Sequence, residues 1–450
     1  MRRIAWLLFV VSSALALAGP ASGGVRPRYG GTLHIMVREA PASLDPAKLS
    51  AAQGARIFPL IFEGLTRFDG HSRLQPQLAM RWQGDSSNQH WQFWLRRGVK
   101  FHDGTALTAE AVAPSLRAAN PGWAVSADGD SVVIETAAPD VELPAELALP
   151  RNGITHRAGN KVVGTGAFLV NDWQTGKSLA LAANEDYWGG RPFADSVLVT
   201  LGQNWRQQMV ALELGKADVV EVAPEQARRL SSASHTIVES APDELVALVF
   251  PRAAQSADEV RVRQALSAAI DRASIMNVLL QGQGETAETI LPNWMTGYAM
   301  LFAQMAEKAE STVSAGSVGT LTLSYDASDP ANQLMAERVA LNARDAGISI
   351  QTAASAANAD VVLVRVAPAS PQPQLALQAV AEAAGLPTPQ FQGTSPEELY
   401  AREKEMLQSS RIIPLAHVPE VTAMGPGVND WSAGLFGGWQ LADVWLGGRP

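Results

Sequence analysis

The pattern of apolar residues changes near Leu245, and this change constrains the fold more than any other feature of the sequence. Before it, short alternating runs end at Gly, Pro or Asp-Gly turns, which is typical of strands and hairpins. After it, strand-like and helix-like runs alternate over residues 321–325, 331–346 and 361–366, which predicts βαβ-type units. Because 450 residues also exceed what one hydrophobic core organises, we expect two or three domains.

The N-terminus has the parts of a secretory signal peptide. Arg2 and Arg3 precede an apolar run over residues 4–17, and residues 16–18 (ALA) offer a small-x-small cleavage site. The run is shorter than the roughly 20 residues of a membrane-spanning helix, and no later segment is apolar enough to cross a bilayer. We therefore expect residues 1–18 to be a cleaved signal peptide and the mature chain to be exported and soluble; an uncleaved anchor is the alternative.

The composition narrows the classes of partner. The chain has no cysteine, which excludes disulfides, thiolate metal ligands, a Cys nucleophile and a lipid-modified Cys behind the signal. A net charge of −9 leaves no basic footprint for nucleic acid. We expect a freely diffusing periplasmic monomer without a lipid anchor.

The run WQFWLRRGVKFHDGTALTAEAV (residues 91–112) contains a His-Asp pair that invites a catalytic interpretation. Asp103-Gly104 has the composition of a tight turn, and Thr108 stands where a helix N-cap belongs. No Ser or Cys nucleophile signature accompanies His102. We interpret the pair as turn chemistry, with a catalytic dyad as the alternative.

Other signatures of chemistry are weak or absent. The seven His are scattered without metal-ligand spacing, and no GxSxG elbow is present. The GKS at residues 176–178 is not a phosphate loop, because Asn171 stands where that motif needs Gly. Tyr187-Trp188 could stack on a ligand ring, with packing as the alternative. We predict no catalytic residue, no metal site and no cofactor.

Several sequence blocks are informative in combination: GGTL…PASLDPA, IFEGLTRFD, LQPQLAMRW…WQFWLRRGVKFHDGTALTAEAV, VVGTGAFLV, NEDYWGG, LELGKADVVE, VRVRQALSAAIDRASIMNVLLQGQGE, RIIPLAHVPEV and FGGWQLADVWLG. In this order they resemble the blocks of the family 5 extracellular solute-binding proteins. These are the dipeptide-, oligopeptide- and nickel-type receptors of ABC importers. The resemblance covers nearly the whole mature chain.

The resemblance implies an α/β, two-lobe periplasmic-binding-protein fold (type II, cluster C-like) with a β-rich insert in lobe 1. Lobe 1 is expected at residues 25–47, 161–243 and 425–450, the insert at 48–160, and lobe 2 at 244–424. A ligand would be enclosed between the lobes by hinge closure and delivered to ABC permease transmembrane subunits.

Two features depart from the family pattern. Residues 114–161 form a short span, so the insert is expected to be shortened. Peptide receptors also carry a W-x-x-D-x-x-D-P segment whose first Asp holds the peptide α-amine. Aligned through Asp360, Pro371 and Pro373, Ala369 takes the place of that Asp. Because a buried ammonium without a carboxylate is costly, the usual peptide anchor is predicted to be absent.

Arg38 and Glu39 leave the first strand into the loop where this fold commonly presents cleft residues, and Arg365 lies beside the altered anchor position. If Arg252 or Arg365 faces the cleft, an anionic ligand becomes attractive, because Arg binds carboxylates through two parallel hydrogen bonds. Solvent-facing, lobe-bridging or packing roles are the alternatives. The candidates are Arg38, Glu39, Arg252, Trp294, Arg365, His417 and Glu420.

The sequence therefore favours a periplasmic solute-binding protein, not an enzyme, that captures a small peptide or another small polar solute. Two alternatives stay open. One is an exported hydrolase. The other is a family member that has lost transport and acts as a sensor or scaffold.

Overall fold

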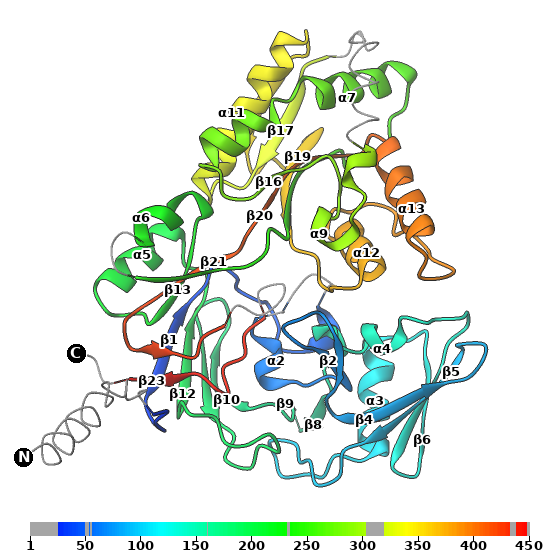
Figure 1. Ribbon diagram of the computed structural model, residues 1–450, viewed down its shortest axis with the longest axis vertical. Helices are drawn as coiled ribbons and strands as arrows, with labels where there is room; N and C mark the ends of the chain where they lie inside the picture. Colours follow the sequence, from blue (N-terminus) through cyan, green and yellow to red (C-terminus); the bar gives the residue numbers. More distant parts are fainter. Residues whose placement is uncertain are drawn as a thin grey trace, which may run out of the picture.

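The computed structural model describes residues 26–49, 54, 56–159, 161–231, 235–302, 319–432 and 438–447. Two lobes lie one above the other in Figure 1, with lobe 2 at the top and lobe 1 and its insert below. The predicted signal peptide, residues 1–18, lies outside the described residues. Among the helices that the structure describes, none combines the length and apolar character needed to cross a bilayer.

Lobe 1 is built on a seven-stranded sheet with the strand order β10-β11-β12-β1-β13-β21-β14. Strand β1 is parallel to both β12 and β13, so the carboxyl ends of these three strands meet at one edge of the sheet. The strands are β1 (Thr32–Met36), β10 (Phe168–Gln174), β11 (Ser178–Ala183), β12 (Ser196–Thr200), β13 (Val219–Val222), β14 (Thr236–Glu239) and β21 (Val421–Met424). Helices α5 (Trp205–Glu213) and α6 (Ala227–Ser231) flank this sheet.

Lobe 2 has a six-stranded sheet covered by helices on both faces. The order is β16-β20-β15-β19-β17-β18. The strands are β15 (Glu244–Val249), β16 (Glu285–Thr286), β17 (Leu321–Tyr325), β18 (Ile350–Ala354), β19 (Val361–Val366) and β20 (Ile412–Val418), and the helices are α7 (Ala257–Ala269), α9 (Asn293–Thr296), α11 (Pro330–Asp345), α12 (Pro373–Ala383) and α13 (Pro396–Gln408).

Alternation along β15 explains why both faces of this sheet are covered. Val246 and Leu248 pack with residues of α7 and α11. Leu245, Ala247 and Val249 point to the other face and pack with α12 and with Leu399 of α13. The apolar residues at all five positions from Leu245 to Val249 therefore predict a strand buried on both sides.

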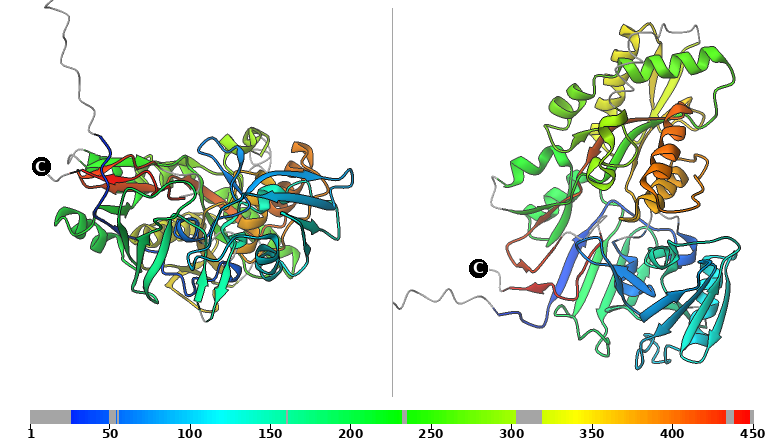
Figure 2. Two further views of the ribbon diagram at one scale, coloured as in Figure 1. Left: turned by 90° about the horizontal axis from the view of Figure 1, so that it is seen from below. Right: turned by 45° about the vertical axis from the view of Figure 1, so that its right-hand side comes forward.

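The insert is a four-stranded sheet, β4-β5-β7-β6, packed against helix α3. Its main elements are β4 (Ala79–Gly84), β5 (His90–Leu95), β6 (Ala124–Asp128), β7 (Ser131–Glu135) and α3 (Ala109–Ala119), with the shorter α4 (Leu143–Glu146), β2 (Thr66–Phe68), β3 (Leu74–Pro76), β8 (His156–Ala158) and β9 (Lys161–Val163). The short helix α2 (Phe58–Ile61) packs in the core of lobe 1 with β1, β10 and β12. Figure 2 shows the insert beside the lobe 1 sheet, on the side opposite α5 and α6.

The turn after β5 has the predicted chemistry. Gly104 has a φ of 86°, and the backbone N–H of Thr105 donates to Oδ1 of Asp103 over 3.0 Å. Nε2 of His102 lies 3.0 Å from the carbonyl oxygen of Gly166, so the ring links the insert to the segment before β10. Thr108 accepts from the backbone N–H of Ala111 and caps α3. These contacts confirm the interpretation of His102-Asp103 as turn chemistry.

A buried carboxylate fixes the insert on lobe 1. Glu63 is 1% exposed, and it accepts hydrogen bonds from Tyr187 Oη (2.9 Å), Trp188 Nε1 (2.9 Å) and Thr165 Oγ1 (2.7 Å). Gln77 Nε2 donates to it from the insert over 3.2 Å. Burial raises the pKa of Glu63 although these donors favour its charge. Tyr187 and Trp188 therefore pack and hydrogen-bond inside the protein, as the packing alternative expected.

Two chain segments cross between the lobes. Residues 240–243 connect β14 to β15, and residues 419–420 connect β20 to β21. The backbone N–H of Ser240 donates to the carbonyl of Glu420, and the N–H of Glu420 donates to Ser240 Oγ, both over 2.9 Å. The predicted end of lobe 2 at residue 424 is wrong, because β21 lies in the lobe 1 sheet, where its backbone pairs with β13 and β14. The other lobe boundaries stay predictions.

The close approach of the segment before β10 to α2 gives a test of the fold. A Cβ on Gly164 would lie 2.0 Å from the carbonyl oxygen of Ile61. Gly164→Ala should therefore lower the free energy of unfolding by about 1–3 kcal/mol or more, measured by urea denaturation. Gly70→Ala is the control, because its Cβ would meet nothing within 4 Å, and it should change stability by less than about 0.5 kcal/mol. Equal effects of the two substitutions would contradict this packing.

Candidate functional site

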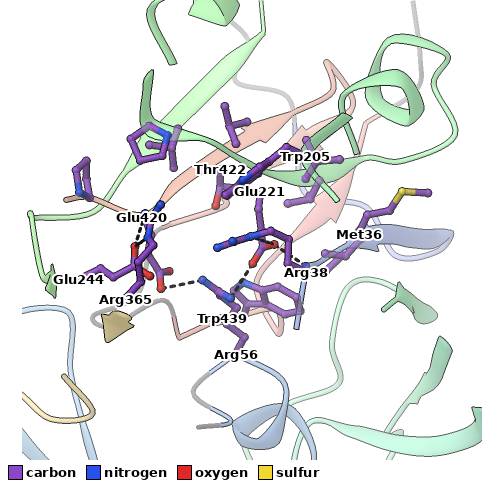
Figure 3. A pocket seen from close by; sticks show the side chains of 17 residues that line it. Met36, Arg38, Arg56, Trp205, Glu221, Glu244, Arg365, Glu420, Thr422 and Trp439 are labelled. Atoms are coloured by element: carbon purple, nitrogen blue, oxygen red, sulfur yellow. Dashed lines mark hydrogen bonds and ion pairs between the residues drawn. The ribbon is translucent and has the colours of Figure 1, made fainter. Parts of the chain in front are cut away.

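A cavity of about 30 Å³ lies where both lobes meet the crossing segments (Figure 3). Arg38 and Glu221 line it from lobe 1, at the carboxyl end of β1 and on β13. Glu244 on β15 and Arg365 on β19 line it from lobe 2, and Glu420 lies in a crossing segment. The remaining lining residues are Ile35, Met36, Arg56, Trp205, Val219, Val220, Val222, Pro224, Pro419, Val421, Thr422 and Trp439. We call this space the hinge pocket.

Arg56, in the turn before α2, lies between lobe 1 and the crossing segment beside the hinge pocket. Its Nη1 lies 2.7 Å from Glu221 Oε1, and its Nη2 lies 2.8 Å from Glu420 Oε1. Burial disfavours the charge of Arg56, but the two carboxylates outweigh burial, so its pKa is raised above the ordinary value. Arg56 therefore stays charged and holds the crossing segment against lobe 1.

Arg365 bonds two carboxylates within lobe 2. Its side chain is 10% exposed, with Nε 2.9 Å from Glu244 Oε2 and Nη1 2.9 Å from Asp329 Oδ2. Burial opposes ionisation of Glu244, but Arg365 outweighs burial and lowers the pKa of this carboxyl. Arg365 faces the hinge pocket, as the anionic-ligand hypothesis required, but its guanidinium already has its partners.

Arg38 lies between the lobes. Its backbone N–H donates to Glu221 Oε2 over 2.6 Å, and its guanidinium carbon lies 3.9 Å from the ring centre of Trp205. Its Nη1 also lies 4.0 Å from Asp329 Oδ2 in lobe 2. Each arginine that lines the hinge pocket is thus close to a carboxylate. An incoming anion must compete with these carboxylates for any of the three guanidinium groups.

The unbalanced charge around the hinge pocket is acidic. Burial raises the pKa of Glu39, and so does the nearby charge of Glu221. Glu225 follows the lining residue Pro224, and its Oε2 is buried without a hydrogen-bond partner among the residues that the structure describes. Burial, and then Asp329, raise the pKa of Glu225. A positively charged ligand group would relieve this repulsion.

Asp243, in the crossing before β15, was not anticipated from the sequence. It is 3% exposed, and its Oδ1 lies 3.4 Å from Ser240 Oγ. Burial first, and then the charges of Glu420 and Glu244, raise the pKa of Asp243 to about 8. This carboxyl is therefore mostly protonated at neutral pH.

The structure brings four of the seven candidate residues together and places three elsewhere. Arg38, Arg365 and Glu420 line the hinge pocket, and Glu39 interacts electrostatically with Arg56, Glu221 and Glu420 around it. Whether these four contact a ligand stays a prediction.

The other three candidates have local partners outside the hinge pocket. Arg252 is half exposed and pairs with Glu259 on α7 over 2.8 Å. Trp294 Nε1 donates to the carbonyl of Pro242 over 3.0 Å. His417 is 2% exposed with Nε2 3.1 Å from the carbonyl of Ile290, and burial lowers its pKa to about 4.

Sequence reasoning missed Arg56, Glu221 and Glu244. Glu221 did carry a signal, because a lone acid inside the otherwise apolar strand VVEV is buried and needs a partner. Arg56 had no such signal. Within the described part of the chain, no cluster of His, Asp or Glu side chains is arranged to hold a metal ion.

Comparisons with known proteins agree with this architecture. The model of the family described as "Bacterial extracellular solute-binding proteins, family 5 Middle" matches residues 73–380. The Nickel-binding periplasmic protein of Escherichia coli K12 is 26% identical over 51% of this chain and 50% of its own length. The Probable D,D-dipeptide-binding periplasmic protein DdpA of the same organism is 24% identical over 64% of each chain. The chain thus spans about half to two thirds of these relatives.

A solved structure supports the fold over nearly the whole chain. The dipeptide binding protein from Pseudoalteromonas sp. SM9913, in complex with Met-Leu, has a TM-score of 0.79 and 18% identity, and the match covers 93% of this chain and 100% of that one. At this identity the likeness concerns the fold alone. It confirms the predicted two-lobe periplasmic-binding-protein fold.

The buried pairs of Arg365 give a test of the network. Arg365→Met should lower the free energy of unfolding by about 3–5 kcal/mol, because it leaves two buried carboxylates without their cation. Arg252→Met is the matched control, since it breaks an exposed pair and should cost less than about 1 kcal/mol. Denaturant unfolding of both variants measures the two changes in the free energy of unfolding. Similar losses of stability would contradict the burial of the ion pairs that Arg365 forms with Glu244 and Asp329.

Asp243 predicts a pH dependence of stability. Its folded pKa of about 8 lies above the ordinary 3.8, so between these values the folded state keeps a proton that the unfolded state releases. Stability therefore falls as pH rises through this window, by at most about 1.4 kcal/mol per pH unit. Asp243→Asn should remove this pH-dependent fall in stability, because Asn does not ionise.

The measurement for Asp243 is urea unfolding at pH 5, 6, 7, 8 and 9. The free energy of unfolding of Asp243→Asn relative to wild type should rise from pH 5 to 8 and then level off. Asp128→Asn, at an exposed position of the insert, should show no such trend. A pH-independent difference for Asp243→Asn would refute the raised pKa.

Proposed function

This chain belongs to the bacterial extracellular solute-binding proteins of family 5, and on this basis we propose that it captures a small peptide or another small polar solute by hinge closure. We propose that it delivers this solute to the transmembrane subunits of an ABC importer. The names of the relatives describe nickel- and dipeptide-binding proteins, and the solute of this chain is part of the proposal.

The observation that carries the proposal is the position of the hinge pocket. Residues of both lobes and of a crossing segment line it. A solute there gains its full set of contacts only when the lobes are together, so it favours the closed state by its differential affinity.

The charges of the hinge pocket favour a solute that carries both signs. A lone anion that took Arg365 would leave Glu244 buried without its cation, which costs several kcal/mol. A zwitterion supplies an ammonium for the freed carboxylate at the same time. Glu244, Asp329 and Glu420 are our candidates for holding that ammonium in place of the Asp that Ala369 replaces.

We further propose that residues 1–18 direct export and that the mature protein acts in the periplasm as a monomer. Members of this family are binding proteins, and we propose that this chain carries out no turnover. An exported hydrolase would instead convert its ligand during the binding experiment below, which distinguishes the two.

A thermal-unfolding screen of the mature chain tests the function. The panel contains dipeptides, amino acids, opines, sugars and metal chelates, each also checked for conversion. A solute at about 100 times its Kd should stabilise the protein by about 2.7 kcal/mol and reduce its radius of gyration in scattering. No shift with any of these solutes would favour the sensor or scaffold alternative.

Two variants locate the binding site. Arg38→Met should weaken binding of the solute at least tenfold, which is roughly 1.4 kcal/mol, whereas Arg252→Met, outside the hinge pocket, should leave the affinity unchanged. If dipeptides bind, Ala369→Asp should strengthen their binding, because it restores a carboxylate for the α-amine. Tight dipeptide binding that Ala369→Asp does not improve would defeat the argument from the missing anchor.

A further inference from the structure

A second pocket, of about 470 Å³, lies between the insert and lobe 2. It shares no lining residue with the hinge pocket. One wall comes from the loops after α3 and β7 and from α4, and the other from one face of α12 and from residues 388–393. Figure 1 shows α12 directly above the insert. We call this space the insert pocket.

A buried amide without a partner lines the insert pocket. Gln374 lies in the first turn of α12 and is only 5% exposed. Its side chain makes no hydrogen bond with any part of the chain that the structure describes. Its amide keeps a small accessible surface and therefore borders the open space of the insert pocket. The space that Gln374 borders can hold a ligand that supplies the missing hydrogen bond.

The opposite wall is acidic. Asp140 and Glu142 line the insert pocket and form no ion pair with the described residues. Burial, and then the charge of Glu146, raise the pKa of Asp140 to about 6; burial, and then Asp140, raise that of Glu142. The only lining cation in the described chain is Arg151, which Glu146 already binds over 2.6 Å. A ligand cation would relieve the repulsion between these carboxylates.

The remaining walls suit the same kind of ligand. Trp123 and Phe391 offer aromatic surface, which attracts cations and packs against aliphatic chains. Arg151 Nη1 also lies 3.8 Å from Glu382 Oε2 on α12, so an ion pair spans the insert pocket from the insert to lobe 2. A ligand held between these walls would bridge the same two bodies.

We propose that the insert pocket binds a cationic residue of a short peptide, with Asp140 and Glu142 accepting its ammonium or guanidinium group and Gln374 hydrogen-bonding its backbone amide. The backbone amide distinguishes a peptide from a simple polyamine, because Gln374 can both donate to its carbonyl and accept from its N–H. This inference rests on the proposed function and adds a specificity for basic peptides through a pocket separate from the hinge pocket.

The test compares two probes that differ only in charge, Gly-Lys-Gly and the same peptide acetylated on the lysine Nζ, by calorimetry with the mature protein. Wild type should bind the lysine peptide at least tenfold more tightly. Glu142→Gln should remove most of this preference, whereas Gln374→Leu should weaken both peptides by a similar factor. Glu397→Gln, which removes an exposed carboxylate from α13 in the same lobe, should change neither affinity.

Several outcomes would overturn the inference. Equal affinity for the two peptides would show that the acids do not select a cation. Tight binding of spermidine that Gln374→Leu leaves unchanged would assign the insert pocket to polyamines. Binding of neutral solutes that Arg38→Met abolishes, without any preference for lysine, would defeat this inference and leave the proposed function intact. Unchanged urea midpoints of Glu142→Gln and Gln374→Leu exclude misfolding as the cause of lost affinity.

Discussion

A buried guanidinium needs carboxylates within reach, and three such groups decide how the parts of this protein meet. Arg56, just before α2, binds Glu221 in lobe 1 and Glu420 in a crossing segment. Arg38 approaches Asp329 in lobe 2, which Arg365 binds in turn. The result is one continuous set of charges through the hinge and both lobes. Any solute that enters the hinge pocket therefore meets arginines that are already paired, within a surplus of acidic groups, and must replace the partner that it displaces.

The pairing of arginines with carboxylates makes the two pockets differ in the kind of charge that they can accept. In the hinge pocket every lining cation is paired, so selection falls on solutes that carry both signs. In the insert pocket Asp140 and Glu142 form no ion pair with the described residues and the lining is rich in amides, so selection falls on a positive group attached to a hydrogen-bonding backbone. A peptide can satisfy either pocket, and the two pockets would contact it through different residues.

Much of the fold could be predicted because it follows from local patterns. The alternation in residues 321–325 and 361–366 gave strands β17 and β19 with their bounds, and Gly347 follows the helix predicted over 331–346. Asp103-Gly104 and Thr108 gave the turn and the helix cap. In each case the residues that determine the structure are neighbours in the sequence, so their spacing is enough.

The site was predicted only in part, because its charges are paired over long distances. Arg252 and Arg365 each belong to a strand or its end, and nothing local distinguishes them. The order of the strands in the sheet distinguishes them. Strand β19 lies between β15 and β17, so Arg365 is enclosed, whereas Arg252 follows the end of β15 and is exposed to solvent. Arg56 and Glu221 are separated by more than half of lobe 1 and its insert, and only the folded chain brings them together.

The four-donor environment of Glu63 has a mechanical consequence. Residues of the insert and of lobe 1 share this one desolvated acid. A rotation of the insert against lobe 1 would therefore leave Glu63 buried without some of its hydrogen-bond donors. In the described part of the chain, the segments around Ser240 and Glu420 join lobe 2 to this body. Lobe 2 contributes Arg365 to the hinge pocket and one face of α12 to the insert pocket, so a movement of lobe 2 would change both cavities together.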